Sequence, residues 1–321
     1  KQKTAYEIST RDWSSDVCSS DLKSRTANRL FRRVVIVNWL VIGNGTQGKK
    51  RRKILGDSCV GVVDPYDFNA EYSSIEQVKE VIDVAAICTS QNIKFEYLRE
   101  LISKGVSCLV EKPFPNMDDD SYSTLESLCK KYNSFIYTAF NHRFEPGIVK
   151  FAEVAANYKL GDFYFCNMRY GNGTAIDVSN SVWKLRDEGL LLDLGSHLID
   201  LVNFIFGENL EQIYLDESLS LEIKGFDYAR LSSKNFYIEI GYVFWKSDFF
   251  IEAYYSKGSI HIEGLQKWGG SKLTIRSRKL PSGVPDEEVF FFKGPDPTWN
   301  SEHRFVEKLI EENAVRSEEH T

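Results

Sequence analysis

Residues 34–55 read VVIVNWLVIGNGTQGKKRRKIL, and this stretch decides the fold. Its first part, Val34–Ile42, is an almost continuous apolar run rich in β-branched residues, which is typical of a strand buried on both faces of a parallel sheet. A glycine-rich segment, Gly43–Gly48, follows at once, and the basic stretch behind it has the character of a helix start. The order strand, glycine turn, helix predicts the opening unit of a doubly wound α/β domain.

The sequence after this unit keeps alternating between strand and helix patterns. Strands are predicted at Val60–Val63, Val84–Cys88, Val106–Val110 and Phe135–Ala139, and helices at Ile93–Lys104 and Asp120–Tyr132. Such alternation argues for a parallel sheet wrapped by helices. We assign residues 33–145 to this first domain.

The pattern changes beyond Pro146, where strands dominate and a boundary falls near residues 141–150. Helices are predicted at Ile148–Tyr158, Asp193–Phe206 and Glu302–Glu312. Strands are predicted at Asp162–Tyr170, Gln212–Leu215, Phe236–Tyr242, Phe249–Tyr255, Ser259–Glu263, Leu273–Arg278 and Glu288–Phe292. Consecutive strands joined by turns predict an α+β domain over 146–315 with a largely antiparallel, open sheet.

Composition excludes several classes of protein. The 321 residues carry 40 basic and 46 acidic side chains, so the net charge of −6 argues against a broad nucleic-acid-binding face. No apolar run reaches the ~20 residues of a membrane span, and no secretory leader is visible. The six cysteines show neither a C-x-x-C pair nor metal-ligand spacing. We therefore expect no metal site, and we expect Cys88, Cys108 and Cys129 to be reduced packing residues in a cytoplasmic protein.

The two ends have a different character from the rest. Residues 1–22, KQKTAYEISTRDWSSDVCSSDL, resemble a translated sequencing adapter, and so do residues Arg316–Thr321. The alternative is that they are disordered native tails. In either case we exclude both ends from the prediction of the fold.

A G-x-G-x-x-G pattern formed by Gly43, Gly45 and Gly48 is the first motif that carries chemistry. Such glycines permit a tight turn and let the backbone approach a pyrophosphate at the helix N-terminus. Asp64 ends the second predicted strand, where a carboxylate can bind ribose hydroxyls and repel a 2′-phosphate. We therefore predict NAD rather than NADP as cofactor. The alternative is a glycine-rich turn with an unrelated Asp-Pro turn.

Two further motifs bear groups that can move protons. Lys112, in Glu111-Lys112-Pro113, ends another strand, where a lysine can donate to an oxygen that develops charge. Asp193 and His197 are four apart, so they share one face of a predicted helix, and the carboxylate can orient and charge the imidazole. The alternatives are a solvated surface lysine and a helix-capping aspartate beside a buried histidine.

Together these segments resemble the Gfo/Idh/MocA family of oxidoreductases, from about Val34 to Phe305. The resemblance implies an N-terminal Rossmann domain that binds NAD and a C-terminal substrate domain. It implies catalytic roles for Lys112, Asp193 and His197, and it matches Asn141-His142-Arg143-Phe144 to a segment at the domain junction. It implies a cofactor site formed by Gly43, Gly45, Thr46, Gln47, Gly48, Asp64, Thr89, Ser90, Asn92 and Glu111.

Some segments, among them Lys267-Trp268-Gly269, look like family members encoded with surface-polysaccharide genes. That subgroup implies a sugar or nucleotide-sugar substrate, with Asn141, Arg143, Asn172, Trp183 and Lys184 as candidate substrate-binding residues. The family resemblance also implies a dimer or tetramer built on the open sheet. The alternatives are an inositol or polyol dehydrogenase and a catalytically silent NAD-binding sensor or scaffold.

Overall fold

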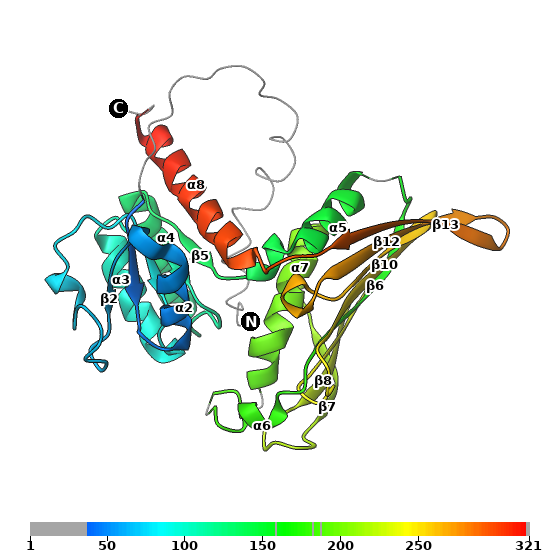
Figure 1. The fold of residues 1–321 in the computed structure, drawn as a ribbon, viewed down its shortest axis with the longest axis horizontal. Coiled ribbons are helices and arrows are strands. Elements are labelled where there is room, and N and C mark those ends of the chain that lie inside the picture. Colours follow the sequence, from blue (N-terminus) through cyan, green and yellow to red (C-terminus); the bar gives the residue numbers. More distant parts are fainter. Residues whose placement is uncertain (1–36, 158, 182, 187, 319–321) are drawn as a thin grey trace. The chain divides into compact units, whose positions relative to one another are not determined.

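The computed structural model describes residues 37–318 except 158, 182 and 187, with side chains up to Asn313 (Figure 1). These residues form two compact units, 37–139 with 299–318, and 140–298. The last helix therefore belongs to the first unit, whereas the sequence analysis grouped it with the second. The reason is packing, because Val306 and Leu309 of this helix join Trp39 and Val41 in one buried cluster. Residues 1–22 and 319–321 lie outside the described residues.

The first unit is a parallel sheet with helices on both faces, as predicted. Its strand order is β2-β1-β3-β4-β5. The strands are β1 (Trp39–Ile42), β2 (Cys59–Val63), β3 (Val84–Ile87), β4 (Ser107–Val110) and β5 (Ile136–Thr138). The helices are α2 (Thr46–Leu55), α3 (Lys94–Ser103), α4 (Asp119–Tyr132) and α8 (Thr298–Glu318), with 3₁₀ turns at Gly56–Ser58, Ile75–Gln77 and Gln91–Ile93.

Each face of this sheet has its own hydrophobic core. Leu40 and Ile42 of β1 face a cluster that includes Leu98 of α3 and Leu125 of α4. Trp39 and Val41 face the opposite cluster with Leu55 of α2 and residues of α8. Alternate residues of one strand are thus buried on opposite faces, which explains why the strand reads as a continuous apolar run.

The second unit is an eight-stranded sheet in the order β13-β12-β11-β10-β6-β9-β8-β7. All neighbours pair antiparallel except β6 with β9, so the predicted, largely antiparallel sheet is confirmed. The strands are β6 (Phe163–Gly171), β7 (Tyr214–Leu219), β8 (Tyr228–Ser233), β9 (Phe236–Gly241), β10 (Asp248–Tyr255), β11 (Gly258–Glu263), β12 (Ser271–Lys279) and β13 (Gly283–Phe292). The sequence analysis missed β8, whose inward residues Ala229 and Leu231 give only a short apolar signal.

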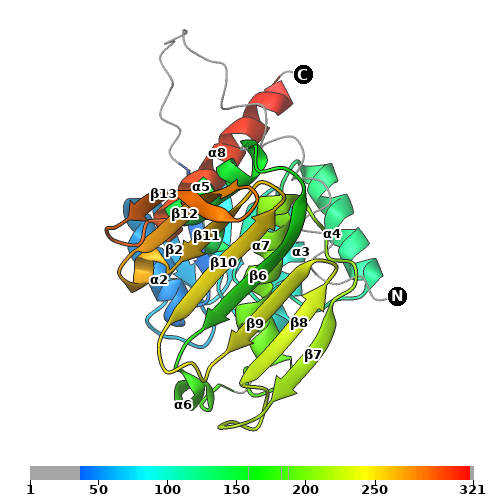
Figure 2. The same ribbon diagram turned by 90° about the vertical axis from the view of Figure 1, so that its right-hand side faces the viewer.

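The described helices of this unit all lie on one face of the sheet (Figure 2). The longest of them are α5 (Pro146–Asn157) and α7 (Ser196–Phe206), which bury Phe151 and Leu201 against the inward side chains of the strands. Shorter elements are α6 (Ala175–Val178), the 3₁₀ turns Asn141–Phe144 and Gln266–Trp268, and a π-helical turn at Leu191–Gly195.

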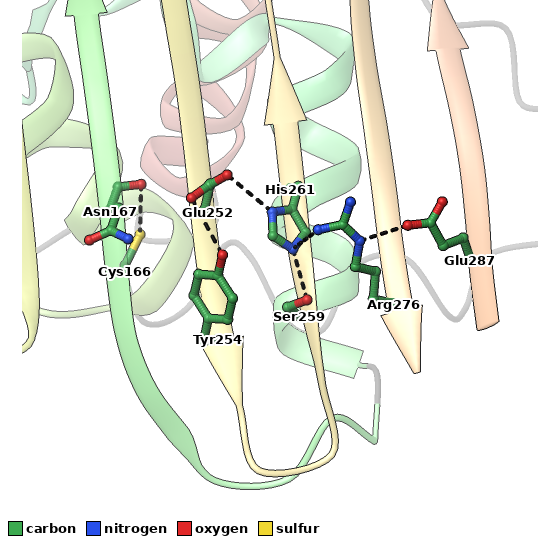
Figure 3. Close-up of polar contacts among 8 residues, drawn as sticks. All are labelled: Cys166, Asn167, Glu252, Tyr254, Ser259, His261, Arg276 and Glu287. Carbon is green, nitrogen blue, oxygen red and sulfur yellow. Dashed lines mark hydrogen bonds and ion pairs between the residues drawn. The ribbon is translucent and has the colours of Figure 1, made fainter. Parts of the chain in front are cut away.

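The opposite face carries polar and aromatic side chains (Figure 3). His261 on β11 lies 2.8 Å from Ser259 Oγ and 3.4 Å from a carboxylate oxygen of Glu252 on β10. Arg276 on β12 donates to Glu287 on β13 at 2.7 Å. Such polar pairs across neighbouring strands stabilise the sheet.

The cysteines of the described residues are all free thiols, as expected. Cys108 is fully buried, whereas Cys88 and Cys129 are only partly buried. Burial raises the pKa of Cys129 to about 11, so its thiol stays protonated at neutral pH. Among the described helices, none is both long and apolar enough to cross a lipid bilayer.

Candidate functional site

In the first unit, the predicted site residues gather at the carboxyl edge of the sheet. Gly43 N donates to Val63 O at 2.8 Å, and Cys88 N donates to Ile42 O at 2.8 Å. Glu111 N donates to Ile87 O at 2.9 Å. These bonds join the residues that follow β1, β2, β3 and β4. The glycine loop, Asp64, Thr89 and the Glu111-Lys112-Pro113 segment therefore line one edge, where ligands bind in open parallel sheets.

The three glycines of the loop meet three different demands. Gly43 has a φ of 95°, and a Cβ there would lie 3.0 Å from Cys88 O. A Cβ on Gly48 would collide with the carbonyl oxygen of Gly43. A Cβ on Gly45 would meet no atom within 4 Å, so the backbone there borders open space. In a dinucleotide-binding loop the first glycine permits the tight turn, the second lets the pyrophosphate approach the backbone, and the third allows close packing of the helix. Gly43, Gly45 and Gly48 meet these demands in that order.

Asp64 is held beside this loop. One carboxylate oxygen accepts a hydrogen bond from Asn44 N at 2.8 Å, and the other accepts from Tyr66 N at 2.9 Å. Each carboxylate oxygen has two acceptor positions, so the group keeps capacity for ribose hydroxyls. Beside Gly43, Thr89 Oγ1 is buried and has no hydrogen-bond partner within the described part of the chain. An open backbone, a fixed carboxylate and a buried hydroxyl fit a dinucleotide.

Four other residues were predicted to bind the cofactor, and they lie in two places: Thr46 and Gln47 on α2, and Ser90 and Asn92 after β3. Thr46 and Gln47 are exposed at the first turn of α2, a helix that carries no acidic residue in that turn. Such a helix start favours an anion. Ser90 Oγ donates to Asn92 Oδ1 at 2.8 Å.

Glu111 takes part in a buried ion network. Arg51 of α2 donates through Nε to a Glu111 carboxylate oxygen at 2.8 Å and pairs with Glu302 of α8 at 2.7 Å. Arg51 Nη1 also lies 2.8 Å from His303 Nε2. Burial alone would lower the pKa of Arg51, but the Glu302 and Glu111 carboxylates outweigh it and raise that pKa. Burial of the His303 ring, followed by the positive charge of Arg51, lowers the pKa of His303 to about 3. The carboxylate of Glu111, a residue predicted to bind the cofactor, is thus paired with Arg51.

Lys94 is a residue that the sequence analysis missed. It is 1% exposed at the start of α3, and its ammonium donates to the carbonyls of Glu111 and, at 2.7 Å, Pro113. These carbonyls flank the half-buried Lys112, so Lys94 fixes the backbone that carries it. Burial lowers the pKa of Lys94 to about 8. The sequence did indicate that Lys94 would be buried, because it lies one turn before Leu98 on the apolar face of the helix.

In the second unit, Asp193 lies in the π-helical turn rather than in the regular helix predicted there. Lys184 forms an ion pair with one Asp193 oxygen at 2.6 Å, and Tyr242 Oη donates to the same oxygen at 3.0 Å. Burial, followed by the Asp193 charge, raises the pKa of Tyr242. The phenol therefore remains a proton donor to Asp193 at neutral pH. Lys184 was predicted to bind substrate, and here it neutralises Asp193.

His197 follows at the start of α7 and is 4% exposed. Its ring stacks on the ring of His142, with centroids 4.2 Å apart. The rings of Phe140 and Tyr170 meet it edge to face, each with a centroid 5.8 Å from that of His197. Lys267 adjoins this group, since its ammonium donates to Tyr170 Oη at 3.0 Å and lies 3.4 Å from His142 Nε2. His197, His142, Tyr170 and Lys267 form one cluster of titratable side chains, and the charge of Asp193 acts on Lys267.

The remaining predicted substrate residues have structural partners. Asn141 Nδ2 donates to Thr298 Oγ1 at 2.8 Å, and Asn172 Oδ1 accepts from Thr174 Oγ1 at 2.6 Å. Arg143 Nε donates to Asp200 at 2.8 Å. Burial raises the pKa of Asp200 although Arg143 opposes the shift. The Trp183 ring lies 5.4 Å from the Lys184 ammonium.

Tyr242, His142, Tyr170 and Lys267 were not predicted as site residues. They come from strands and turns far from Asp193 in the sequence, and no local spacing connects them. His142 and Lys267 do lie in segments that the resemblance had singled out, Asn141-His142-Arg143-Phe144 and Lys267-Trp268-Gly269.

Comparisons with known proteins agree with this architecture. Residues 148–261 match the family model described as the GFO/IDH/MocA C-terminal domain. Trans-1,2-dihydrobenzene-1,2-diol dehydrogenase of Xenopus laevis is 27% identical over 176 residues, which cover 50% of this chain and 53% of that protein. The chain thus spans about half the length of this curated relative.

Two crystal structures share the fold. A dehydrogenase from Clostridium difficile superposes with a TM-score of 0.66 at 19% identity, covering 86% of this chain and 91% of that one. An inositol dehydrogenase homologue from Azotobacter vinelandii, complexed with NADH and myo-inositol, superposes with a TM-score of 0.61 at 16% identity. That match covers 79% of this chain and 75% of the other. The matches confirm the predicted fold class, a Rossmann-like parallel sheet joined to a large, mostly antiparallel one.

Proposed function

We propose that the chain is an NAD-dependent dehydrogenase that oxidises a hydroxyl-bearing carbon of a sugar or nucleotide sugar. The observation that carries the proposal is the glycine loop, in which Gly45 borders open space while Asp64 is held to the loop by Asn44 N. The match of residues 148–261 to the GFO/IDH/MocA C-terminal domain supports it. NAD, when bound, supplies the hydride acceptor.

The cofactor preference follows from charge. Asp64 has two carboxylate oxygens that already accept backbone N–H groups and can still accept ribose hydroxyls. A 2′-phosphate at this place would meet a second negative charge, and no cation among the described residues forms an ion pair with Asp64. We therefore propose NAD over NADP. Gly43–Gly48 would hold the pyrophosphate, and Thr89, Ser90 and Asn92 would extend the cofactor site along the same sheet edge.

The protein's own side chains would handle the proton. His197 would act as general base on the substrate hydroxyl, and Lys112 would donate to the same oxygen and stabilise its alkoxide character. Asp193 would balance the charge that develops on His197. Lys184 and Tyr242 hold one oxygen of Asp193, so this carboxylate keeps its place as His197 gains a proton. Asn172 and Trp183 would contact the sugar, while Asn141 and Arg143 would support the surrounding chain.

A polyol such as inositol is the second candidate substrate. The observation that favours it is the fold shared with the Azotobacter vinelandii structure that contains NADH and myo-inositol. The same residue roles serve both substrates, because each presents a secondary hydroxyl.

We further propose that a second copy of the chain covers the outer face of the eight-stranded sheet. Phe165, Tyr237, Val289 and Phe291 point to this face and are between 36% and 65% exposed. Apolar side chains gathered on one uncovered face are typical of an interaction surface. Sedimentation velocity of the full chain would report a dimer or larger assembly if the proposal holds.

The decisive experiment follows NADH formation while sugars, nucleotide sugars and polyols are offered. We expect Lys112→Ala and His197→Ala each to lower kcat/KM by at least about a hundredfold, because each removes a proton-handling group. Lys104→Ala is the matched control, since Lys104 is an exposed lysine that pairs only with Glu100 on α3. Near-native turnover in both site variants would contradict the proposed roles.

The cofactor assignment has a separate readout. We expect Asp64→Ala to weaken NAD binding by about tenfold or more in calorimetry, because ribose hydroxyls lose a charged acceptor. Tighter binding of NADP than of NAD by the native chain would contradict the role given to Asp64.

A further inference from the structure

Lys267 lies in a turn that the fold holds firmly in place. The 3₁₀ turn Gln266–Trp268 joins β11 to β12. Gln266 N donates to a Glu145 carboxylate oxygen at 2.8 Å, and Trp268 N donates to Leu265 O at 2.9 Å. Glu145 is only 1% exposed, so the anchor of this turn is buried. Lys267 therefore projects from a defined position.

The surroundings of its ammonium group are unusual for a lysine. The group donates to Tyr170 Oη at 3.0 Å, approaches His142 Nε2 at 3.4 Å and lies 4.6 Å from the centre of the Trp268 ring. No carboxylate in the described ranges forms an ion pair with it. Asp296, Glu145 and Asp193 act on it only from a greater distance, and burial of the group prevails in lowering its pKa to about 8.

Lys267 is an exposed residue, so its charge needs no protein anion beside it, and water can solvate it until a ligand binds. Lys184, by contrast, has one, since it pairs with Asp193 at 2.6 Å. Lys267 has a phenol and an imidazole instead. An ammonium has three donor positions, and these two neighbours account for two. Because the residue is exposed, a bound molecule can reach the side chain.

We infer that Lys267 binds an anionic oxygen group of the substrate, with the Trp268 ring beside it as a flat apolar surface for the sugar. This inference rests on the proposed function and narrows its substrate class. The substrate is then an acidic sugar, whose negative charge comes either from a carboxylate, as in a uronic acid, or from a phosphate, as in a nucleotide sugar. A neutral polyol leaves Lys267 without its counterion.

Calorimetry with the full chain tests the inference, with D-glucuronate, UDP-glucose and D-glucose as probes. Each is titrated with and without NADH. The native chain is expected to bind at least one of the two anionic probes about tenfold to a hundredfold more tightly than glucose, as a charge-assisted hydrogen bond would give. The glucuronate and UDP-glucose arms then tell a carboxylate from a phosphate.

Variants assign the preference to Lys267. Lys267→Gln is expected to abolish the preference for the anion while the affinity for glucose changes less than about twofold. Lys267→Arg should retain it, because the charge remains. Lys257→Met, at an exposed lysine in the turn between β10 and β11, is the matched control and should bind like the native chain. Melting curves of each variant establish that it is folded.

Two results would overturn the inference. One is a native chain that binds neither anion more tightly than glucose. The other is a folded Lys267→Gln variant that keeps the native preference. Failure of the proposed function looks different, because it appears as absent NAD binding or absent NADH formation, whereas the preference for an anion is measured without turnover.

Discussion

Cations near the candidate site are held differently in the two units, since Arg51 and Lys94 are buried whereas Lys267 is exposed. In the first unit, Arg51 pairs with Glu111 and Glu302, and Lys94 donates to two backbone carbonyls. In the second unit, the Lys267 ammonium donates to Tyr170 Oη and lies near His142 Nε2 and the Trp268 ring, and it forms no ion pair with a carboxylate among the described residues. A cation whose partners all come from the protein fixes the structure. A cation that lacks an anionic partner is available to a ligand, and this difference separates a support from a recognition group.

The largest expected effect comes from removing Arg51. Arg51→Met leaves Glu302 and Glu111 buried without their cation, so we expect the free energy of unfolding to fall by about 3–5 kcal/mol. Urea denaturation followed by circular dichroism measures the change. Lys267→Met is the contrasting variant, with an expected change below about 1 kcal/mol. Equal losses of unfolding free energy in the two variants would contradict the proposed difference between Arg51 and Lys267.

Removing Lys94 should have a smaller effect. Lys94→Met deprives the carbonyls of Glu111 and Pro113 of their donor, so we expect a loss of about 2 kcal/mol. Hydrogen exchange should quicken at the amides around Lys112, because the backbone of that segment loses its support. Lys104→Met, at the exposed end of the same helix, provides the comparison and should leave both measurements unchanged.

The smallest expected effect is one of pH on ligand binding. The pKa of Lys267 is about 8, lowered from its ordinary value chiefly by burial, while Asp296, Glu145 and Asp193 pull it upward. The anion needs the protonated amine, so binding is at full strength below pH 8 and weakens as pH rises through that value. We expect about a tenfold loss of affinity for the preferred anion per pH unit above 8, with glucose binding unaffected.

Calorimetry at a series of pH values measures this loss of affinity. Tyr170 and His142 are the titratable side chains in contact with the Lys267 ammonium. Lys267→Gln should show no such slope. A native affinity for the anion that stays constant from pH 7 to pH 10 would contradict the assignment.

The first unit could be predicted from sequence because its signals are local. Trp39–Ile42 is buried on both faces, and a run of apolar residues ending in glycines is enough to identify it. Asp64 follows the next strand along the chain, and its bond to Asn44 N agrees with the predicted position beside the loop. Neighbouring segments of one strand–turn–helix unit specify this part of the site.

The second unit was less predictable because its cluster is assembled from distant segments. Tyr242 reaches Asp193 from the end of β9, and Lys267 reaches Tyr170 across neighbouring parts of the sheet. Such contacts depend on strand order, and the parallel pairing of β6 with β9 has no signature in either strand. For the same reason β8, with its short apolar signal, was missed.

The return of α8 to the first unit has a consequence for synthesis of the chain. His303 and Glu302 of α8 are made long after Arg51, since Arg51 and His303 are 252 residues apart. The whole second unit is translated between these partners. A nascent first unit therefore holds a cation on its glycine-loop helix whose second carboxylate partner, Glu302, is made only after the whole second unit has been translated. A substitution that removes Glu302 from α8 would thus destabilise α2 through the loss of its pair with Arg51.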